Sequence, residues 1–108
     1  MPVSTSIPEV IEMGRQLILE NLADDIKAIA RRHGAANLRV FGSFARGAET
    51  LSSDLDLLVD FEPGRDLLDL IGLKQELEKR LGIRVDVVTE QGMSPYLRSR
   101  ILEEARPL

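Results

Sequence analysis

The spacing of apolar residues along the chain predicts three helical segments. Residues 7–33 carry apolar side chains three or four positions apart, which is the period of an amphipathic helix, and Gly34 marks the end of this segment. Residues 66–81 repeat the spacing and predict a second helix, which Gly82 ends. A shorter helix is expected at 94–105, beginning at residue 94 or 95 and ending near residue 105.

Shorter runs of apolar and β-branched residues predict three strands, at 38–41, 54–61 and 84–88. Between the first two, residues 42–47 form a glycine-containing turn that opens a short helix. This order predicts an α/β (α+β) fold with helices packed on a small sheet of three or more strands. Because the link 47–54 is short, we expect a mixed sheet rather than a purely parallel one.

Size and composition agree with one globular domain. Of the 108 residues, 44% are hydrophobic and 30% charged, which is the balance of a folded chain. We therefore expect a single domain over 1–108, in which 1–20 form an N-terminal helix or a loose extension. The net charge of −4, from 14 basic and 18 acidic residues, argues against direct nucleic-acid binding as the main task.

The residue types that the sequence lacks exclude several kinds of site. Without cysteine there are no disulfides, thiolate metal sites or cysteine nucleophiles, and a single histidine, His33, argues against triads and poly-histidine sites. No signal peptide is recognisable, and no apolar run approaches the about 20 residues of a membrane span, so a cytoplasmic protein is expected. Any metal would then be held by carboxylates, which favours Mg²⁺ or Mn²⁺.

The acidic residues of the second and third predicted strands are the main candidates for chemistry. Asp54 and Asp56 are two positions apart in a strand, so both carboxylates face the same side. Their repulsion raises the pKa of each unless a cation lies between them, and Mg²⁺ suits oxygen ligands of this kind. Asp86 lies among β-branched residues on the next strand. If these strands are neighbours, three carboxylates can hold one or two Mg²⁺ ions.

The turn before these acids predicts a phosphate site. Gly42 lets the backbone approach a ligand closely, and the following helix offers free N–H groups at its first turn. The hydroxyl of Ser43 can donate to a phosphate oxygen, and Arg46 can pair with phosphate or with Asp54. A phosphate site beside a carboxylate–metal site favours phosphoryl or nucleotidyl transfer from a nucleoside triphosphate.

These residues carry a resemblance to a known family. Phe41-Gly42-Ser43, then Asp54-Leu55-Asp56 and later Asp86, resemble the signature of the nucleotidyltransferase superfamily of DNA polymerase β. The wider pattern is similar to the minimal nucleotidyltransferase (MNT) proteins, the antitoxin half of HEPN/MNT toxin–antitoxin pairs. The similarity runs from about Asn21 to the end of the chain, including the segment 96–105.

The resemblance implies a nucleotidyltransferase fold and a specific reaction. MNT antitoxins transfer AMP from ATP, with Mg²⁺, to a tyrosine hydroxyl of a HEPN ribonuclease toxin encoded by an adjacent gene. By this resemblance Gly42 and Ser43 grip the triphosphate, and Asp54 and Asp56 ligate Mg²⁺. Asp86 would ligate metal or help to deprotonate the acceptor hydroxyl. Two alternatives stay open: an antitoxin that neutralises its toxin by binding alone, and a nucleotidyltransferase acting on a small molecule or an RNA.

Overall fold

The computed structural model describes residues 19–47 and 54–108. Its elements follow the predicted order and add one strand at the end. In chain order they are α2 (Ala23–Arg32), β1 (Ala35–Phe41), α3 (Ser43–Arg46), β2 (Leu55–Phe61), α4 (Leu67–Leu81), β3 (Val85–Val88), α5 (Pro95–Glu104) and β4 (Arg106–Pro107). The part of the expected first helix at 7–18 lies outside the described residues. Strand β4 was not predicted, and β1 begins at Ala35 rather than at residue 38.

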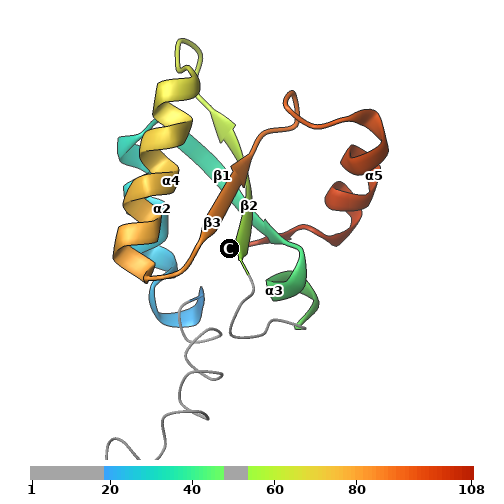
Figure 1. Cartoon of the computed structure of the whole chain (residues 1–108), viewed down its shortest axis with the longest axis horizontal. Coiled ribbons are helices and arrows are strands. Elements are labelled where there is room, and N and C mark those ends of the chain that lie inside the picture. The colour runs from blue at the N-terminus through green and yellow to red at the C-terminus, as the bar shows by residue number, and fades with distance from the viewer. Residues whose placement is uncertain (1–18, 48–53) are drawn as a thin grey trace, which may run out of the picture.

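The four strands form one mixed sheet in the order β3-β2-β1-β4, which confirms the predicted α/β fold with a mixed sheet. Strands β2 and β3 are parallel, whereas β1 runs antiparallel to both β2 and β4. Helices α2 and α4 cover one face of the sheet, and α5 lies on the opposite side (Figure 1). The antiparallel arrangement of β1 places its end beside the beginnings of β2 and β3.

The core lies between the sheet and the helix pair α2/α4. In β2 the side chains of Leu55, Leu57 and Val59 are fully buried, while Asp56 and Asp60 point to the other face. This alternation follows from the pleat of a strand, in which successive side chains leave opposite faces. From the helices, the core receives Ile26, Ile29, Ala30, Leu73, Leu77 and Leu81. The face of β2 that carries Leu55, Leu57 and Val59 thus packs against α2 and α4. Asp56 and Asp60 lie on the opposite face, outside this core.

Helix α4 begins with a complete capping box. The side chain of Asp66 accepts hydrogen bonds from the backbone N–H groups of Leu68 and Asp69, at 3.0 and 3.4 Å. In return Asp69 Oδ2 accepts from the backbone N–H of Asp66 at 3.0 Å. This hydrogen bond is the main reason that the pKa of Asp69 is lowered. The box satisfies N–H groups that the first helical turn would otherwise leave without partners.

A bulge in β1 sets the direction in which that strand meets the acidic face. The pairing with β2 shifts between Ala36 and Arg39, and Asn37 adopts φ = 52°. The Asn37 Nδ2 group donates to Asp60 Oδ2 at 2.8 Å, which holds the extra residue at the edge. Beyond the bulge, Val40 is buried on the core side and Phe41 lies opposite Asp56. After this register shift, Phe41 at the end of β1 lies opposite Asp56.

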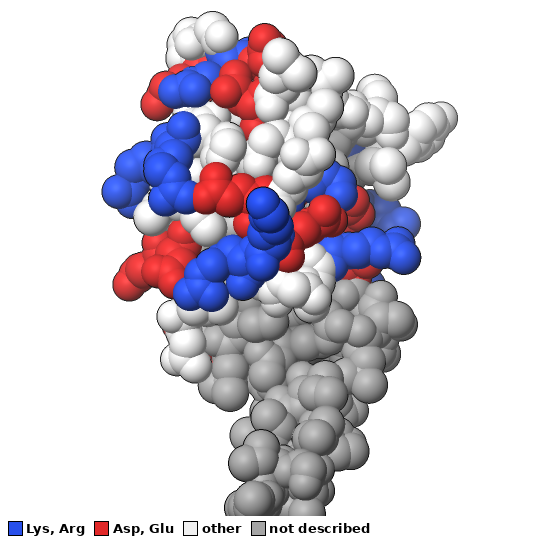
Figure 2. Space-filling view, turned by 60° about the vertical axis from the view of Figure 1, so that its left-hand side comes forward, with Lys and Arg blue, Asp and Glu red and all other residues white. Residues whose placement is uncertain are grey.

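The outer surface of α2 and α4 carries basic and acidic side chains interspersed with one another (Figure 2). Arg80 of α4 pairs with Asp25 of α2 at 2.7 Å, and Arg32 pairs with Glu76. These ion pairs connect the two helices across their solvent side. Of the helices that the structure describes, none combines the length and apolar character that crossing a membrane requires.

Candidate active site

The end of β1 and the beginnings of β2 and β3 meet at one edge of the sheet. In the register of the sheet, Phe41 lies opposite Asp56, and Asp56 lies opposite Asp86. Leu55, the first residue of β2, donates its N–H to the carbonyl oxygen of Arg84 at 2.9 Å, which aligns the two acidic strands. The expected neighbourhood of the second and third strands is confirmed. The carboxylates of Asp56 and Asp86 therefore leave adjacent strands at the same level.

Asp56 is the carboxylate most affected by this arrangement. Its pKa is raised from 3.8 to about 6. Burial contributes most, followed by the charge of Asp86, a side-chain hydrogen bond with Asp86 and the charges of Asp54 and Glu104. The structure thus brings Asp54 and Asp86 close enough to Asp56 for their negative charges to repel its carboxylate. The charges of Asp86, Asp54 and Glu104 all act on Asp56, so a positive charge would be favourable beside it.

Gly42 brings the backbone directly against this acidic group. It has φ = 73° and ψ = −150°, a conformation that side chains disfavour, and it precedes α3 as its N-cap. A Cβ atom at this position would overlap with Oδ2 of Asp56. Ser43, half-buried, is the first residue of α3. The predicted turn residues Gly42 and Ser43 therefore lie next to the predicted acids.

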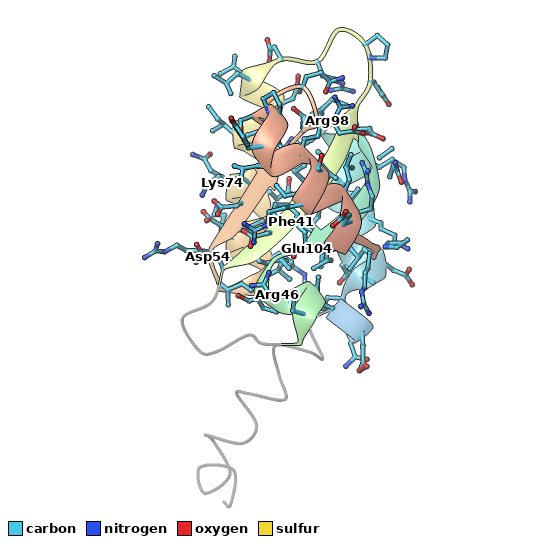
Figure 3. All side chains as sticks on the ribbon, turned by 90° about the vertical axis from the view of Figure 1, so that its right-hand side faces the viewer. Phe41, Arg46, Asp54, Lys74, Arg98 and Glu104 are labelled. Carbon is cyan, nitrogen blue, oxygen red and sulfur yellow. The ribbon has the colours of Figure 1, made fainter. Side chains whose placement is uncertain are left out.

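Arg46 takes part in a contact that the sequence did not indicate. Its Nη1 group donates to both carboxylate oxygens of Glu104, at 3.1 and 3.3 Å. The same carboxylate accepts the backbone N–H of Gly42 at 2.8 Å. Arg46 on α3 and Glu104 at the end of α5 lie at the same side of the sheet in Figure 3. In the structure the Arg46 guanidinium pairs with Glu104 rather than with Asp54, and its pairing with phosphate stays a prediction.

Glu104 is the residue of this site that sequence reasoning missed. The only available signal was its place in the segment 96–105, which carries part of the family resemblance, and nothing in the local pattern gave this glutamate a role. Its pKa is lowered, first by the hydrogen bond from Gly42 and then by Arg46. Glu104 is therefore ionised beside the other acids of the site.

The donor set fits a hard divalent cation, although it is not arranged as a finished metal site. Within 19–47 and 54–108, no three His, Asp or Glu side chains are placed to hold a metal ion together. The acids offer only oxygen ligands, and the pKa of Asp56 is raised first by its burial and then by the charge of Asp86. The assignment of Asp54, Asp56 and Asp86 as metal ligands therefore remains a prediction, which requires their side chains to turn toward one ion.

A family model and an individual relative point to the same protein family. The sequence model described as "Nucleotidyltransferase domain" matches residues 22–108, which include every residue of this site. The protein adenylyltransferase MntA of Thermococcus cleftensis is 40% identical over 78 residues, covering 72% of this chain and 79% of the relative.

Solved structures share the fold. A protein assigned as a minimal nucleotidyltransferase is 54% identical and superposes with a TM-score of 0.72, over 83% of this chain and 95% of the other. A toxin–antitoxin complex with AMP-PNP superposes with a TM-score of 0.68, over 78% of this chain and 69% of the other, at 23% identity. At that identity the second likeness concerns the fold alone.

Proposed function

Because the chain belongs to the nucleotidyltransferase domain family, we propose that it transfers AMP from ATP to a tyrosine hydroxyl of a HEPN ribonuclease toxin, and so acts as the antitoxin. The observation that supports this most directly is the row formed by Asp56 and Asp86, with Gly42 against Asp56. In that row two carboxylates lie beside the Gly42 turn, whose backbone comes directly against Asp56.

The chain's own residues divide the work of the transfer. The Gly42–Ser43 turn binds the triphosphate, and the Ser43 hydroxyl donates to a phosphate oxygen. Asp86 takes the proton of the acceptor hydroxyl or holds the metal. The hydroxyl oxygen forms a bond to the α-phosphorus, the bond from that phosphorus to the bridging oxygen breaks, and pyrophosphate leaves.

Mg²⁺ is the cofactor that these residues would hold, through Asp54, Asp56 and Asp86. When bound, it supplies positive charge that neutralises the phosphates and the developing negative charge. The raised pKa of Asp56 supports this assignment, because a cation would offset both its causes, which are first the burial of the carboxyl group and then the charge of Asp86. ATP as donor is supported by the solved toxin–antitoxin structure with AMP-PNP, which shares this fold.

The partner in this proposal is a toxin encoded by a neighbouring gene. Two relatives support it: the Thermococcus cleftensis protein carries the name MntA, and a solved structure of the same fold is a toxin–antitoxin complex.

The test is transfer of label from α-³²P-ATP to the purified neighbouring gene product in the presence of Mg²⁺. We expect label on the toxin with the wild-type chain and at least a hundredfold slower labelling with Asp56→Asn, since this variant loses a carboxylate of the row. Asp60→Asn is a matched control on the same strand and face, and it should label within about threefold of wild type. Absence of label with folded wild type, Mg²⁺ and ATP rejects the proposal. Label that persists after tyrosines of the toxin are changed to phenylalanine rejects tyrosine as acceptor.

Neutralisation by binding alone is the second candidate, because α4 and α5 each expose large apolar side chains. Leu67 and Leu68 at the start of α4 are 67% and 75% exposed, and Tyr96 of α5 is 90% exposed. Such apolar side chains are typical of protein contacts when they occur together. The double variant Asp54→Asn/Asp56→Asn separates the two functions. If it still neutralises the toxin at ordinary expression, binding suffices; if neutralisation is lost while the complex still forms, catalysis is required.

A further inference from the structure

We propose that Glu104 is a positioning residue for nucleotidyl transfer, which holds Gly42 and Arg46 in the geometry that receives the triphosphate. This inference rests on the proposed function, because it concerns how the same site binds its donor. Glu104 itself contacts neither the acceptor nor the reacting phosphorus in this account. It acts through the turn and the guanidinium that it holds.

The contacts of Glu104 bracket the short helix α3. Its carboxylate accepts the N–H of Gly42 before the helix, at 2.8 Å, and Nη1 of Arg46 at the helix end, at 3.1 Å. Helix α3 has only 4 residues, from Ser43 to Arg46, and a helix this short is not stable by itself. A charged acceptor at both ends therefore fixes the segment that carries the Ser43 hydroxyl.

Strand β4 explains why Glu104 arrives at this place. Arg106 pairs with Val40 in the antiparallel register of β4 and β1, and Leu108 donates its N–H to the carbonyl oxygen of Leu38 at 3.1 Å. The pairing aligns the end of α5 with the last residues of β1, where the Gly42 turn begins. Glu104 thus reaches Gly42 across 62 positions of sequence because a two-residue strand anchors the chain there.

Stability of the core alone does not account for this glutamate. Helix α5, which carries it, has no buried residue. The negative charge of Glu104 also raises the pKa of Asp56, so its electrostatic effect on the acid group is unfavourable. An acid that adds repulsion to an acidic site is better explained by what it holds than by its contribution to folding.

The carboxylate of Glu104 could weaken or strengthen phosphate binding at this turn, and its contacts favour the second effect. A carboxylate on Gly42 and Arg46 could compete with phosphate, or it could orient these groups for phosphate. Both contacts to Arg46 use Nη1, and a guanidinium has further N–H donors to offer an anion. A Cβ on Gly42 would overlap with Oδ2 of Asp56, and the N–H of Gly42 is held by Glu104, so the turn contacts both carboxylates. We therefore assign Glu104 the orienting role.

The test compares Glu104→Ala, Glu104→Gln and wild type in steady-state transfer to the toxin, with ATP as the varied substrate. For Glu104→Ala we expect KM for ATP to rise by about ten- to hundredfold, with kcat within about threefold. Glu104→Gln keeps an acceptor for the Gly42 N–H but loses the charge beside Arg46. Relative to wild type it should raise KM by about three- to tenfold, a smaller loss of binding than in Glu104→Ala. Glu103→Ala, an exposed neighbour on the same helix, is the matched control and should leave both constants unchanged.

A lower KM in Glu104→Ala would show competition and would overturn the proposal. An unchanged KM in Glu104→Ala would overturn it too. If Glu104→Ala does not fold, Glu104→Gln decides by itself, and an unchanged KM in that variant overturns the proposal.

A second measurement separates this inference from the proposed function. Amide hydrogen exchange of Gly42, followed by NMR without nucleotide, should be at least tenfold faster in Glu104→Ala than in wild type, because its acceptor is lost. If wild type transfers no AMP but this exchange rises, the proposed function fails and the positioning contact stands. If the exchange at Gly42 is unchanged in the variant, Glu104 does not hold the turn, whatever the activity.

Discussion

The backbone of Gly42 and the carboxylate of Asp56 are in direct contact, so close that a Cβ atom on residue 42 would overlap with Oδ2 of Asp56. The contact joins the end of β1 to the beginning of β2, and it explains why the turn requires glycine for two independent reasons. The φ angle of 73° disfavours any side chain, and the neighbouring carboxylate excludes one. The phosphate turn and the acid group are therefore one structural unit.

We expect Gly42→Ala to destabilise the protein by about 2–4 kcal/mol and to abolish AMP transfer. The added methyl group must displace either the turn or Asp56, and both belong to the site. Thermal denaturation followed by circular dichroism measures the stability, and the labelling assay measures the transfer.

The control for this variant is Gly47→Ala. Gly47 also has positive φ, at 68°, but within 19–47 and 54–108 no atom apart from its chain neighbours and the backbone of its own helix lies within 4 Å of the position of its Cβ. It should therefore lose only about 1 kcal/mol, from the backbone conformation alone. In the double variant Gly42→Ala/Asp56→Ala, part of the loss in stability should be recovered, because the side chain that the methyl group meets is absent. Equal losses for Gly42→Ala and Gly47→Ala would contradict the contact.

The raised pKa of Asp56 predicts a pH-dependent effect of Asp56→Asn on stability without added metal. In the unfolded chain this carboxyl ionises near 3.8, whereas in the folded protein it keeps its proton until about pH 6. Between these values the folded state binds more protons, so wild-type stability falls as pH rises from about 4 to about 6. Asparagine carries no charge to repel its neighbours.

Asp56→Asn should therefore be more stable than wild type by about 1–2 kcal/mol at pH 8, a figure reduced for solvent screening, and equal to it near pH 4. Urea denaturation of both proteins at a series of pH values in EDTA provides the measurement. A difference that does not change between pH 4 and pH 8 would show that folding does not raise the pKa of Asp56.

Mg²⁺ together with a non-hydrolysable ATP analogue should raise the melting temperature of the wild-type protein by about 3–8 °C, since a ligand that binds only the folded state stabilises it. Asp56→Asn and Asp86→Asn should lose most of this shift, because each removes an oxygen ligand from the row. Differential scanning fluorimetry in matched buffers measures the shift, with Asp60→Asn as control. A full shift in both acid variants would place the metal elsewhere.

The capping box of α4 predicts a purely structural effect. Asp66→Ala removes the side chain that accepts from the N–H groups of Leu68 and Asp69. It should lower the free energy of unfolding by about 1 kcal/mol and leave the kinetic constants for transfer unchanged. The measurement pairs denaturant unfolding with the labelling assay. A change in KM for ATP would mean that α4 is coupled to the site.

The acids of the site were predictable from the sequence because they depend on local rules. Strand alternation predicts Asp54 and Asp56 on one face, although β2 begins only at Leu55, and the short link after residue 47 indicates the reversal of β1 that brings Gly42 to Asp56. The register that sets Asp86 opposite Asp56 follows from pairing two short strands whose hydrophobic faces must be buried together.

The contribution of Glu104 was not predictable because it depends on a tertiary contact with no local signature. Strand β4 has two residues, too few for any period to be visible in the sequence, yet it brings the end of α5 to the Gly42 turn. The bulge at Asn37 is similarly hidden, since the positive φ arises from its pairing with Asp60. The spacing of apolar residues in the sequence predicts which face of a helix or strand is buried. A contact of one residue with a distant one can be seen only once the sheet has assembled.

The 62 positions between Gly42 and Glu104 also have a consequence for biosynthesis. A ribosome makes the turn, both acidic strands and α4 before it makes Glu104. A nascent chain can therefore bury its leucine core while α3 still lacks the carboxylate that brackets it. In the proposed role of Glu104, a product truncated before α5 would lack the carboxylate that holds Gly42 and Arg46, and it would bind ATP more weakly.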